Sequence, residues 1–321
     1  MIDKKFAGFS SRDLVYSTVN GLDILVTVLT PDILRERPPS QYPVLVHWHG
    51  GGFITGNRLY APWWPDWFLE FAISHNAIIL SPDYRLLPEA NGTDVFDDVV
   101  AFSNWMHDEL PLIADRESWH ASPDLDRVAA IGASSGGNLA VQMALLPSRK
   151  IHVKAVISVC APLEYIGNGT LVPQGPRRIL GACPPPPRQA EALIRDYIRA
   201  IKPGTVRLGG DPADMWPMLL SIVQQAWLPR MLGHEENSRF DMTKVLDKVE
   251  SIPPVWISHS EQDSIIPVKC STDFAKAVEM KFPDSPMLLN VKPGDHMWTD
   301  ALSMNEPWVR EGCQFIDQFW V

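Results

Sequence analysis

A serine placed between two glycines is the first feature of the chain that could do chemistry. Gly132-Ala-Ser134-Ser-Gly136 matches the pattern G-x-S-x-G, follows the apolar run Val128–Ile131 and precedes the helix-forming stretch Asn138–Leu146. Between a strand and a helix, the serine of this pattern lies on a strained turn with its hydroxyl above the sheet. A phosphate-binding turn is the alternative, but neither a P-loop lysine nor G-x-G-x-x-G accompanies the motif. The pattern therefore predicts Ser134 as a nucleophile.

A serine nucleophile needs a general base and an acid that orients the base. In an open α/β sheet these groups gather at the carboxyl ends of strands, so the residues after the last two predicted strands are the candidates. Asp263 follows the predicted strand Val255–His259, and His296 follows Met287–Val291. The order Ser134, Asp263, His296 is the order of a hydrolase triad, with His296 as the base.

Two other carboxylates compete with Asp263 for the role of the acid. Glu261 lies two residues earlier, and Asp295 precedes His296 directly. Adjacent side chains on a turn rarely face each other in the geometry that a triad requires, which disfavours Asp295. We therefore expect Asp263 as the acid and keep Glu261 as the alternative.

Attack by a serine produces an oxyanion, which needs preorganised N–H donors. The run His49-Gly50-Gly51-Gly52 follows the predicted strand Val44–His47 and offers backbone N–H groups that a substrate can approach closely. The N–H of Ser135 lies at the start of the helix after the nucleophile. We expect the oxyanion hole at Gly51, Gly52 and Ser135, and His49 as a brace of the loop without a role in proton transfer.

Three motifs in this order resemble those of the hormone-sensitive-lipase-like group of α/β-hydrolases. They are H-G-G-G-F at 49–53, D-Y-R-L-x-P-E at 83–89 and G-x-S-x-G-G-N-L-A at 132–140. The resemblance implies carboxylic ester hydrolysis through an acyl-enzyme, with neither metal nor cofactor, and an ion-paired turn at 83–85. The chain departs from the group's usual G-D-S-A-G at Ala133 and Ser135. Its proline- and tryptophan-rich middle is similar to that of fungal biosynthetic-cluster hydrolases.

Strand and helix patterns alternate along most of the chain, which predicts an α/β-hydrolase fold with a mostly parallel sheet covered by helices on both faces. The alternation stops between about residues 163 and 251, where helices are expected at Ala190–Ile201 and Met215–Met231. We therefore expect a core domain formed by 1–162 and 252–321, and a helical cap inserted at 163–251.

The composition limits the partners of the chain. Of 321 residues 45% are hydrophobic, and the formal net charge is −10, which argues against nucleic-acid binding. There is no signal-like N-terminus or bilayer-spanning run, so we expect a cytoplasmic protein without stable membrane insertion. The four cysteines have no zinc-type spacing and are expected as buried free thiols. The family resemblance suggests a monomer or homodimer.

Aromatic residues are candidates for the wall of an apolar pocket, although packing in the core is the default for each of them. The candidates are Phe53, Trp63, Trp64, Trp67, Trp216 and Trp227.

Three kinds of function fit these residues. The first is a serine esterase or lactonase that acts on a small to medium apolar substrate. The second keeps the triad but passes the acyl group to another acceptor, cyclises it or cleaves a C–C bond, because the cap selects the acceptor. The third is a ligand-binding receptor, which is disfavoured because such receptors lack the triad histidine. A peptidase or an interfacial lipase is also compatible with the triad, but no apolar lid helix is evident.

Overall fold

The computed structural model describes residues 3–147, 150–164, 177–233 and 238–321. Its centre is a sheet in which eight strands lie in the order β1-β2-β4-β3-β5-β6-β7-β8. β1 and β2 form an antiparallel hairpin, β2 pairs antiparallel with β4, and all later pairs are parallel. The strands are β1 Phe9–Val19, β2 Leu22–Pro31, β3 Ser40–Trp48, β4 Ile78–Pro82, β5 Ala121–Ala133, β6 Val153–Val159, β7 Val255–Ser260 and β8 Met287–Lys292.

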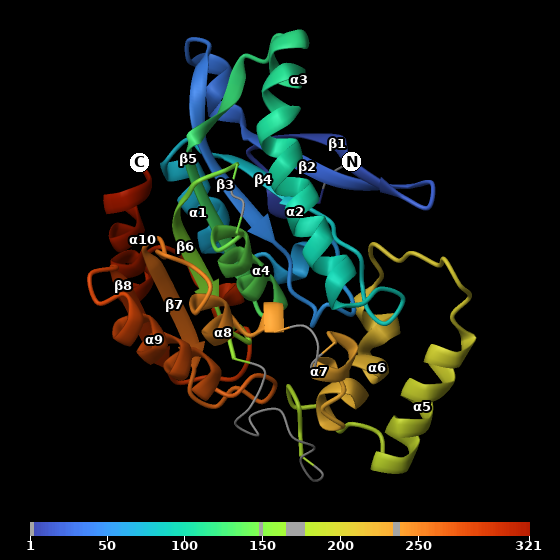
Figure 1. Ribbon diagram of the computed structural model, residues 1–321. Helices are drawn as coiled ribbons and strands as arrows, with labels where there is room; N and C mark the ends of the chain where they lie inside the picture. The colour runs from blue at the N-terminus through green and yellow to red at the C-terminus, as the bar shows by residue number, and fades with distance from the viewer. Residues whose placement is uncertain (1–2, 148–149, 165–176, 234–237) are drawn as a thin grey trace.

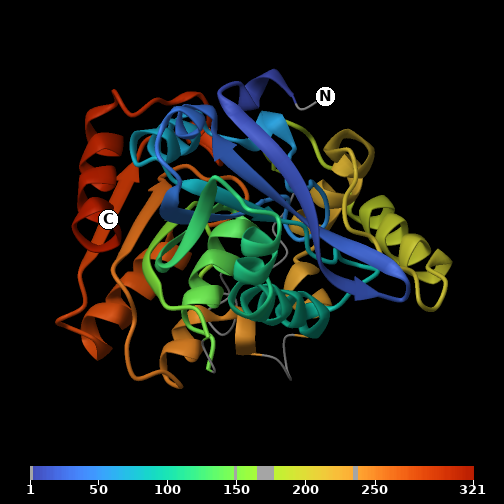
Figure 2. The same ribbon diagram turned by 90° about the horizontal axis from the view of Figure 1, so that it is seen from above.

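Helices cover both faces of this sheet, as the alternating sequence pattern predicts (Figures 1 and 2). Successive side chains along a strand point to opposite faces of the sheet, so neighbouring residues pack against different helices. Val44 and Val46 pack with α2 and α4, whereas Leu45 packs with α1 and α10. The helices are α1 Asp66–Ser74, α2 Gly92–Asp108, α3 Leu110–Arg116, α4 Ser135–Ala144, α5 Pro187–Ala200, α6 Pro212–Gln224, α7 Leu228–Met231, α8 Met242–Leu246, α9 Lys269–Lys281 and α10 Pro307–Trp320.

The helices α5 to α8 lie between β6 and β7 in the chain, where the regular alternation stops. Figure 1 shows α5, α6 and α7 in yellow tones beside one end of the sheet. The single helix expected at Met215–Met231 is wrong: the structure has α6 and α7, separated by a turn in which Ala226 has φ 50°. Pro229 lies in the first turn of α7, the helical position that tolerates proline best.

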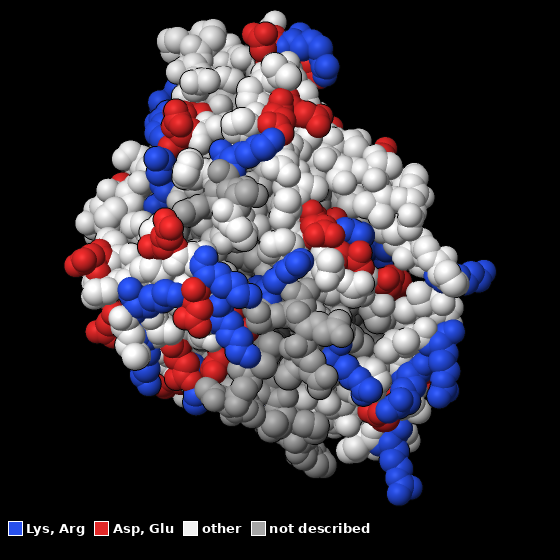
Figure 3. All heavy atoms as spheres, in the orientation of Figure 1, with Lys and Arg blue, Asp and Glu red and all other residues white. Residues whose placement is uncertain are grey.

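Figure 3 shows charges of both signs over most of this face of the molecule, with Lys and Arg side chains gathered toward the lower right. No helix in the described part of the chain is both long and apolar enough to span a bilayer. The expectation of buried thiols holds for Cys160, Cys270 and Cys313, but it is wrong for Cys183, which is free and exposed.

Candidate active site

Ser134 lies on the sharp turn between β5 and α4. Its backbone has φ 55° and ψ −127°, a combination that costs a non-glycine residue free energy and that clusters at functional sites. Its N–H donates a hydrogen bond to the carbonyl of Val159 (2.7 Å), which fixes the turn against the end of β6. Since Ser134 directly precedes the helix, the N–H of Ser135 belongs to the first turn of α4 and has no intrahelical acceptor.

The turn requires glycine because the backbone of a neighbouring strand approaches it closely. A Cβ at Gly136 would lie 2.0 Å from the carbonyl oxygen of Trp48 at the end of β3. The neighbouring atom is part of the backbone, so no side-chain rotation would relieve the clash. The second glycine of the motif therefore lets α4 start directly against β3.

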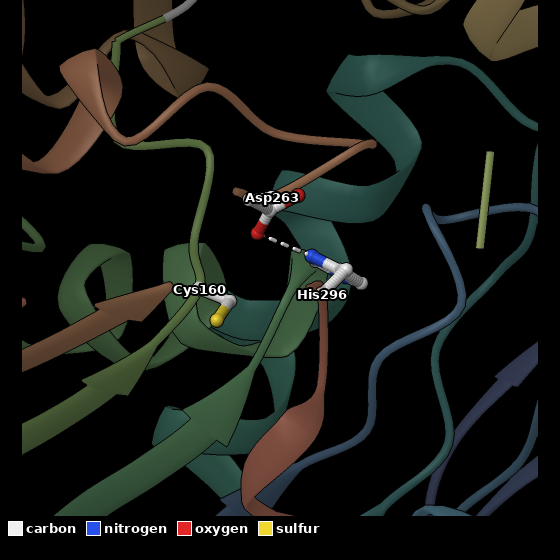
Figure 4. Close-up of side chains that lie close together, drawn as sticks. All are labelled: Cys160, Asp263 and His296. Atoms are coloured by element: carbon white, nitrogen blue, oxygen red, sulfur yellow. Dashed lines mark hydrogen bonds and ion pairs between the residues drawn. The ribbon is translucent and has the colours of Figure 1, made fainter. Parts of the chain in front are cut away.

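The structure brings Asp263 and His296 together, on the segments that follow β7 and β8 (Figure 4). His296 Nδ1 lies 2.7 Å from Asp263 Oδ2. An ionised carboxylate only accepts hydrogen bonds, so Nδ1 carries a proton, and in the neutral form of the ring Nε2 keeps a free lone pair. Neither rival occupies this place: Glu261 is exposed, and Asp295 accepts the backbone N–H groups of Ser264 and His296, both at 2.7 Å.

The carboxylate of Asp263 is held in its ionised form. Burial alone would raise its pKa, but the neighbouring His296 and His259 outweigh burial and hold the pKa well below its usual range. His259 Nε2 lies 3.3 Å from Oδ2, and the N–H groups of Ile265 and Ile266 donate to Oδ1 at 2.8 and 2.7 Å. Asp263 is thus fixed in position and acts only as an acceptor at neutral pH.

Cys160 is the third side chain of this cluster, and its thiol lies within 4.8 Å of ligand atoms of Asp263 and His296. The set could in principle hold a metal ion. Burial raises the pKa of the thiol to about 12, so the thiol is protonated at neutral pH when no metal is bound. The hydrogen bond between Asp263 and His296 explains the proximity of the two titratable side chains without a metal.

The loop that follows β3, here called the oxyanion loop, comprises residues 49–56. The carbonyl of Gly51 accepts the N–H groups of Ile54 and Thr55 at 2.9 and 3.1 Å, so the glycines form a tight turn. Gly51 has φ 103°, and a Cβ there would lie 2.1 Å from the carbonyl oxygen of Thr55. Only glycine fits this position.

His49 supports the oxyanion loop from inside the protein. Its Nδ1 donates to the carbonyl of Gly50 at 2.8 Å, and its ring stacks on Tyr84 with the centroids 4.3 Å apart. Burial lowers the pKa of His49 to about 4, so the ring is neutral at physiological pH. These contacts agree with the expected role of a brace.

The turn at 83–85 is ion-paired, as the family resemblance implies. Asp83 binds the side chain of Arg58 and accepts its backbone N–H at 2.8 Å. Arg85 binds Asp98 and Asp94, each at 2.8 Å, and so ties the turn to α2. The hydroxyl of Tyr84 donates to the carbonyl of His49 at 2.9 Å, which links this turn to the oxyanion loop.

Gly50, Gly51, Gly52, Ser134, Ser135 and His296 all line one cavity of about 280 Å³. The opposite wall is apolar and comes largely from the inserted helices. No Asp, Glu, Lys or Arg of the described part of the chain lines the cavity. The apolar lining residues are Trp63, Pro162, Leu180, Trp216, Leu219, Ile222, Val223, Ala226, Leu228, Pro229, Ile265, Ile266 and Met297.

Two of the six aromatic candidates, Trp63 and Trp216, line this cavity. The other four lie elsewhere in the structure. Phe53, Trp64 and Trp67 are buried in the core and at most 2% exposed. Trp227 packs against Arg195 and Arg230, and its Nε1 donates to Glu191 at 2.9 Å.

Most of the apolar wall lay outside the residues singled out from the sequence. On α6, Trp216, Leu219 and Val223 are spaced three and four residues apart, so they share one face of the helix. That spacing could have indicated them. Ile265 and Ile266 give no such signal, because they line the cavity only through the turn that binds Asp263.

A serine on a strand–turn–helix junction, an Asp–His pair on the segments that follow β7 and β8, and a glycine loop that lines the same cavity are the arrangement of an α/β-hydrolase. The family model described as "alpha/beta hydrolase fold" matches residues 45–180. A "probable carboxylesterase" of Phoma sp. is 46% identical over 318 residues, which cover 99% of this chain and 98% of that protein. The chain belongs to the α/β-hydrolase family.

Other relatives agree with this family. A "probable carboxylesterase" of Cochliobolus lunatus is 50% identical over 60% of this chain and 86% of its own length. Among solved structures, the esterase LipW from Mycobacterium marinum has a TM-score of 0.62 and 18% identity, with 98% of this chain and 83% of that chain covered. This likeness shows a shared fold.

Proposed function

We propose that the protein hydrolyses neutral, apolar carboxylic esters through an acyl-enzyme on Ser134. The observation that carries the proposal is the shared cavity, in which Ser134 and the Asp263-bound His296 face an uncharged apolar wall. A charged substrate group would lose its hydration in such a site without gaining a partner, so neutral substrates are favoured.

The reaction follows from the proton positions. His296 Nε2 takes the proton of Ser134 while Oγ attacks the carbonyl carbon, and the Asp263 carboxylate stabilises the resulting imidazolium. The oxyanion is stabilised by the N–H groups of Gly51, Gly52 and Ser135. His296 then returns the proton to the leaving alcohol. Water attacks the acyl-enzyme by the same route in reverse, which releases the acid and restores the serine.

The size of the cavity sets the expected substrate. A volume of about 280 Å³ lies near the lower end of the roughly 300–1,000 Å³ that is typical of small-molecule pockets. This suits short to medium acyl chains or small lactones. A relative that covers nearly the whole chain is named a probable carboxylesterase, which favours water as the acceptor over the acyl-transfer, cyclisation and C–C cleavage alternatives.

We also propose that residues 163–251 act as the cap of this site, since α6 and α7 supply much of its apolar wall. A cytoplasmic location and a monomeric or homodimeric state complete the proposal. Three buried free thiols suit a reducing compartment. Light scattering of the purified protein would measure the oligomeric state.

Covalent labelling tests the nucleophile separately from turnover. A fluorophosphonate should phosphonylate Ser134 in the wild type, and peptide mass spectrometry should locate the adduct there. Ser135→Ala is the matched control, because it removes the neighbouring hydroxyl and keeps the backbone N–H. We expect labelling in Ser135→Ala and none in Ser134→Ala. An adduct on any other residue would contradict the assignment.

A further inference from the structure

The segment between α5 and α6, here called the arm, comprises residues 202–211 and is bound directly to the oxyanion loop. Gly210 of the arm forms an antiparallel bridge with Gly56 of the loop. The carbonyl of Arg207 accepts the N–H of Leu86 at 2.8 Å. The loop before α6 is therefore part of the structure that surrounds the oxyanion loop.

The guanidinium of Arg207 joins three segments of the chain. Nη1 donates to the carbonyl of Ile54 in the oxyanion loop at 2.6 Å, and Nη2 donates to the carbonyl of Leu87. Nε donates to Oε2 of Glu89 at 2.9 Å, and the other oxygen of this carboxylate accepts the hydroxyl of Tyr197 on α5 at 2.7 Å. The Glu89 side chain is 5% exposed and that of Arg207 17%, so water competes little for these bonds.

The bond to Ile54 acts close to the proposed oxyanion donors. The N–H of Thr55 belongs to the same peptide as the Ile54 carbonyl, and it donates to the carbonyl of Gly51 at 3.1 Å, so the peptide that Arg207 holds is bound directly to the glycine turn. Leu219 of α6 packs on the same loop, with its Cδ1 2.9 Å from where a Cβ of Gly52 would be. A shift of Ile54 would therefore move the glycine turn relative to Ser134.

We propose that Arg207, anchored by Glu89, is a positioning residue that holds the oxyanion loop in the geometry needed for the transition state. The inference rests on the proposed function. Arginine suits this role because its planar fork presents several donors in fixed directions, whereas a lysine offers one point charge. Arg207 does not line the cavity and acts through the carbonyl of Ile54.

The test compares Arg207→Met, Arg207→Lys and the double variant Arg207→Met/Glu89→Gln with the wild type. The double variant avoids leaving the Glu89 carboxylate buried without its partner, which could prevent folding. Rates on a p-nitrophenyl ester are divided by the concentration of sites that a fluorophosphonate titrates, so unfolded protein does not count. Arg199→Met, which removes an exposed cation from α5, is the matched control.

We expect kcat per titrated site to fall by about 10- to 100-fold in Arg207→Met and in the double variant, because small displacements of catalytic groups have effects of that size. KM should change by less than about threefold, since ground-state binding uses the apolar wall. The Ki of an aryl trifluoromethyl ketone, which adds to the serine as a tetrahedral oxyanion, should rise by the factor by which kcat/KM falls. Arg207→Lys should recover part of the loss, and Arg199→Met should match the wild type.

Unchanged kcat and Ki per titrated site in both Met-containing variants would overturn the inference, even if their melting temperatures fall. A rise in KM alone would also overturn it. If the wild type itself shows no Ser134-dependent turnover, the proposed function fails, and the inference falls with it for that separate reason.

Discussion

The turn that holds Ser134 and helix α6 face each other across one cavity, yet different constraints shape them. At the turn, backbone atoms touch backbone atoms: a Cβ at Gly136 would lie 2.0 Å from the carbonyl oxygen of Trp48. On α6, the side chains of residues such as Trp216 and Val223 line the cavity. Close backbone contacts determine the conformation of the turn, whereas the apolar side chains of α6 determine the surface of the cavity wall.

We therefore expect the turn to determine whether the reaction takes place, and α6 to determine which substrate binds. Backbone sterics permit few sequences, so the turn that holds Ser134 must remain nearly invariant for the chemistry to work. A wall of apolar side chains can change residue by residue and keep the fold, because cores tolerate substitutions that conserve volume and pattern. We expect changes on α6 to alter which ester is cleaved, and changes at the turn to abolish cleavage.

Gly136→Ala gives the largest expected effect on folding. The added methyl group must displace the end of β3 or the start of α4, which should lower the free energy of unfolding by about 3 kcal/mol, the upper end of the usual cost of overpacking. Urea denaturation measures the change. Gly210→Ala is the control from the inserted region, where the nearest atom to a new Cβ is 4.0 Å away. Equal stability of the two variants would show that the turn is less constrained than its contacts indicate.

Asp263→Asn should lower kcat on the order of 10⁴-fold and leave the fold intact, because an amide holds the imidazole of His296 in the wrong tautomer. Steady-state kinetics on a p-nitrophenyl ester measures this effect. Glu261→Gln, at an exposed position, should keep its activity. If Glu261→Gln loses the activity and Asp263→Asn keeps it, the acid has been assigned to the wrong residue.

Trp216→Ala gives the smallest expected effect on rate and the clearest effect on selectivity. Removal of the indole enlarges the cavity, so the preferred acyl chain should lengthen by at least about two carbons, while kcat/KM on the best substrate stays within about tenfold. A series of p-nitrophenyl esters measures the profile. Trp227→Ala is matched in chemistry and lies in the same inserted region but does not line the cavity, so its profile should not move. A shift in both variants would point to a general loosening of the inserted helices.

The two regions also differ in how well the sequence predicts them. The fold was predictable because strands and helices alternate with the right periods, and Ser134, Asp263 and His296 could be selected from their places after predicted strands. Trp64 and Trp67 show the limit, since composition does not distinguish a buried tryptophan from one that lines a cavity. Arg207 could not be selected at all, because its partners Ile54 and Glu89 are over a hundred residues away in the chain. Contacts between such distant residues depend on how the inserted region packs against the core domain.

The most direct test of the account is hydrolysis of p-nitrophenyl esters from acetate to decanoate by wild type, Ser134→Ala and Ser135→Ala. We predict turnover with a preferred chain length in the wild type, a fall in kcat on the order of 10⁶-fold in Ser134→Ala, and retained turnover in Ser135→Ala. Full activity of Ser134→Ala in a clean preparation would contradict the mechanism. A burst of acylated Ser134 followed by little turnover would contradict hydrolysis as the natural outcome and would favour an acceptor other than water.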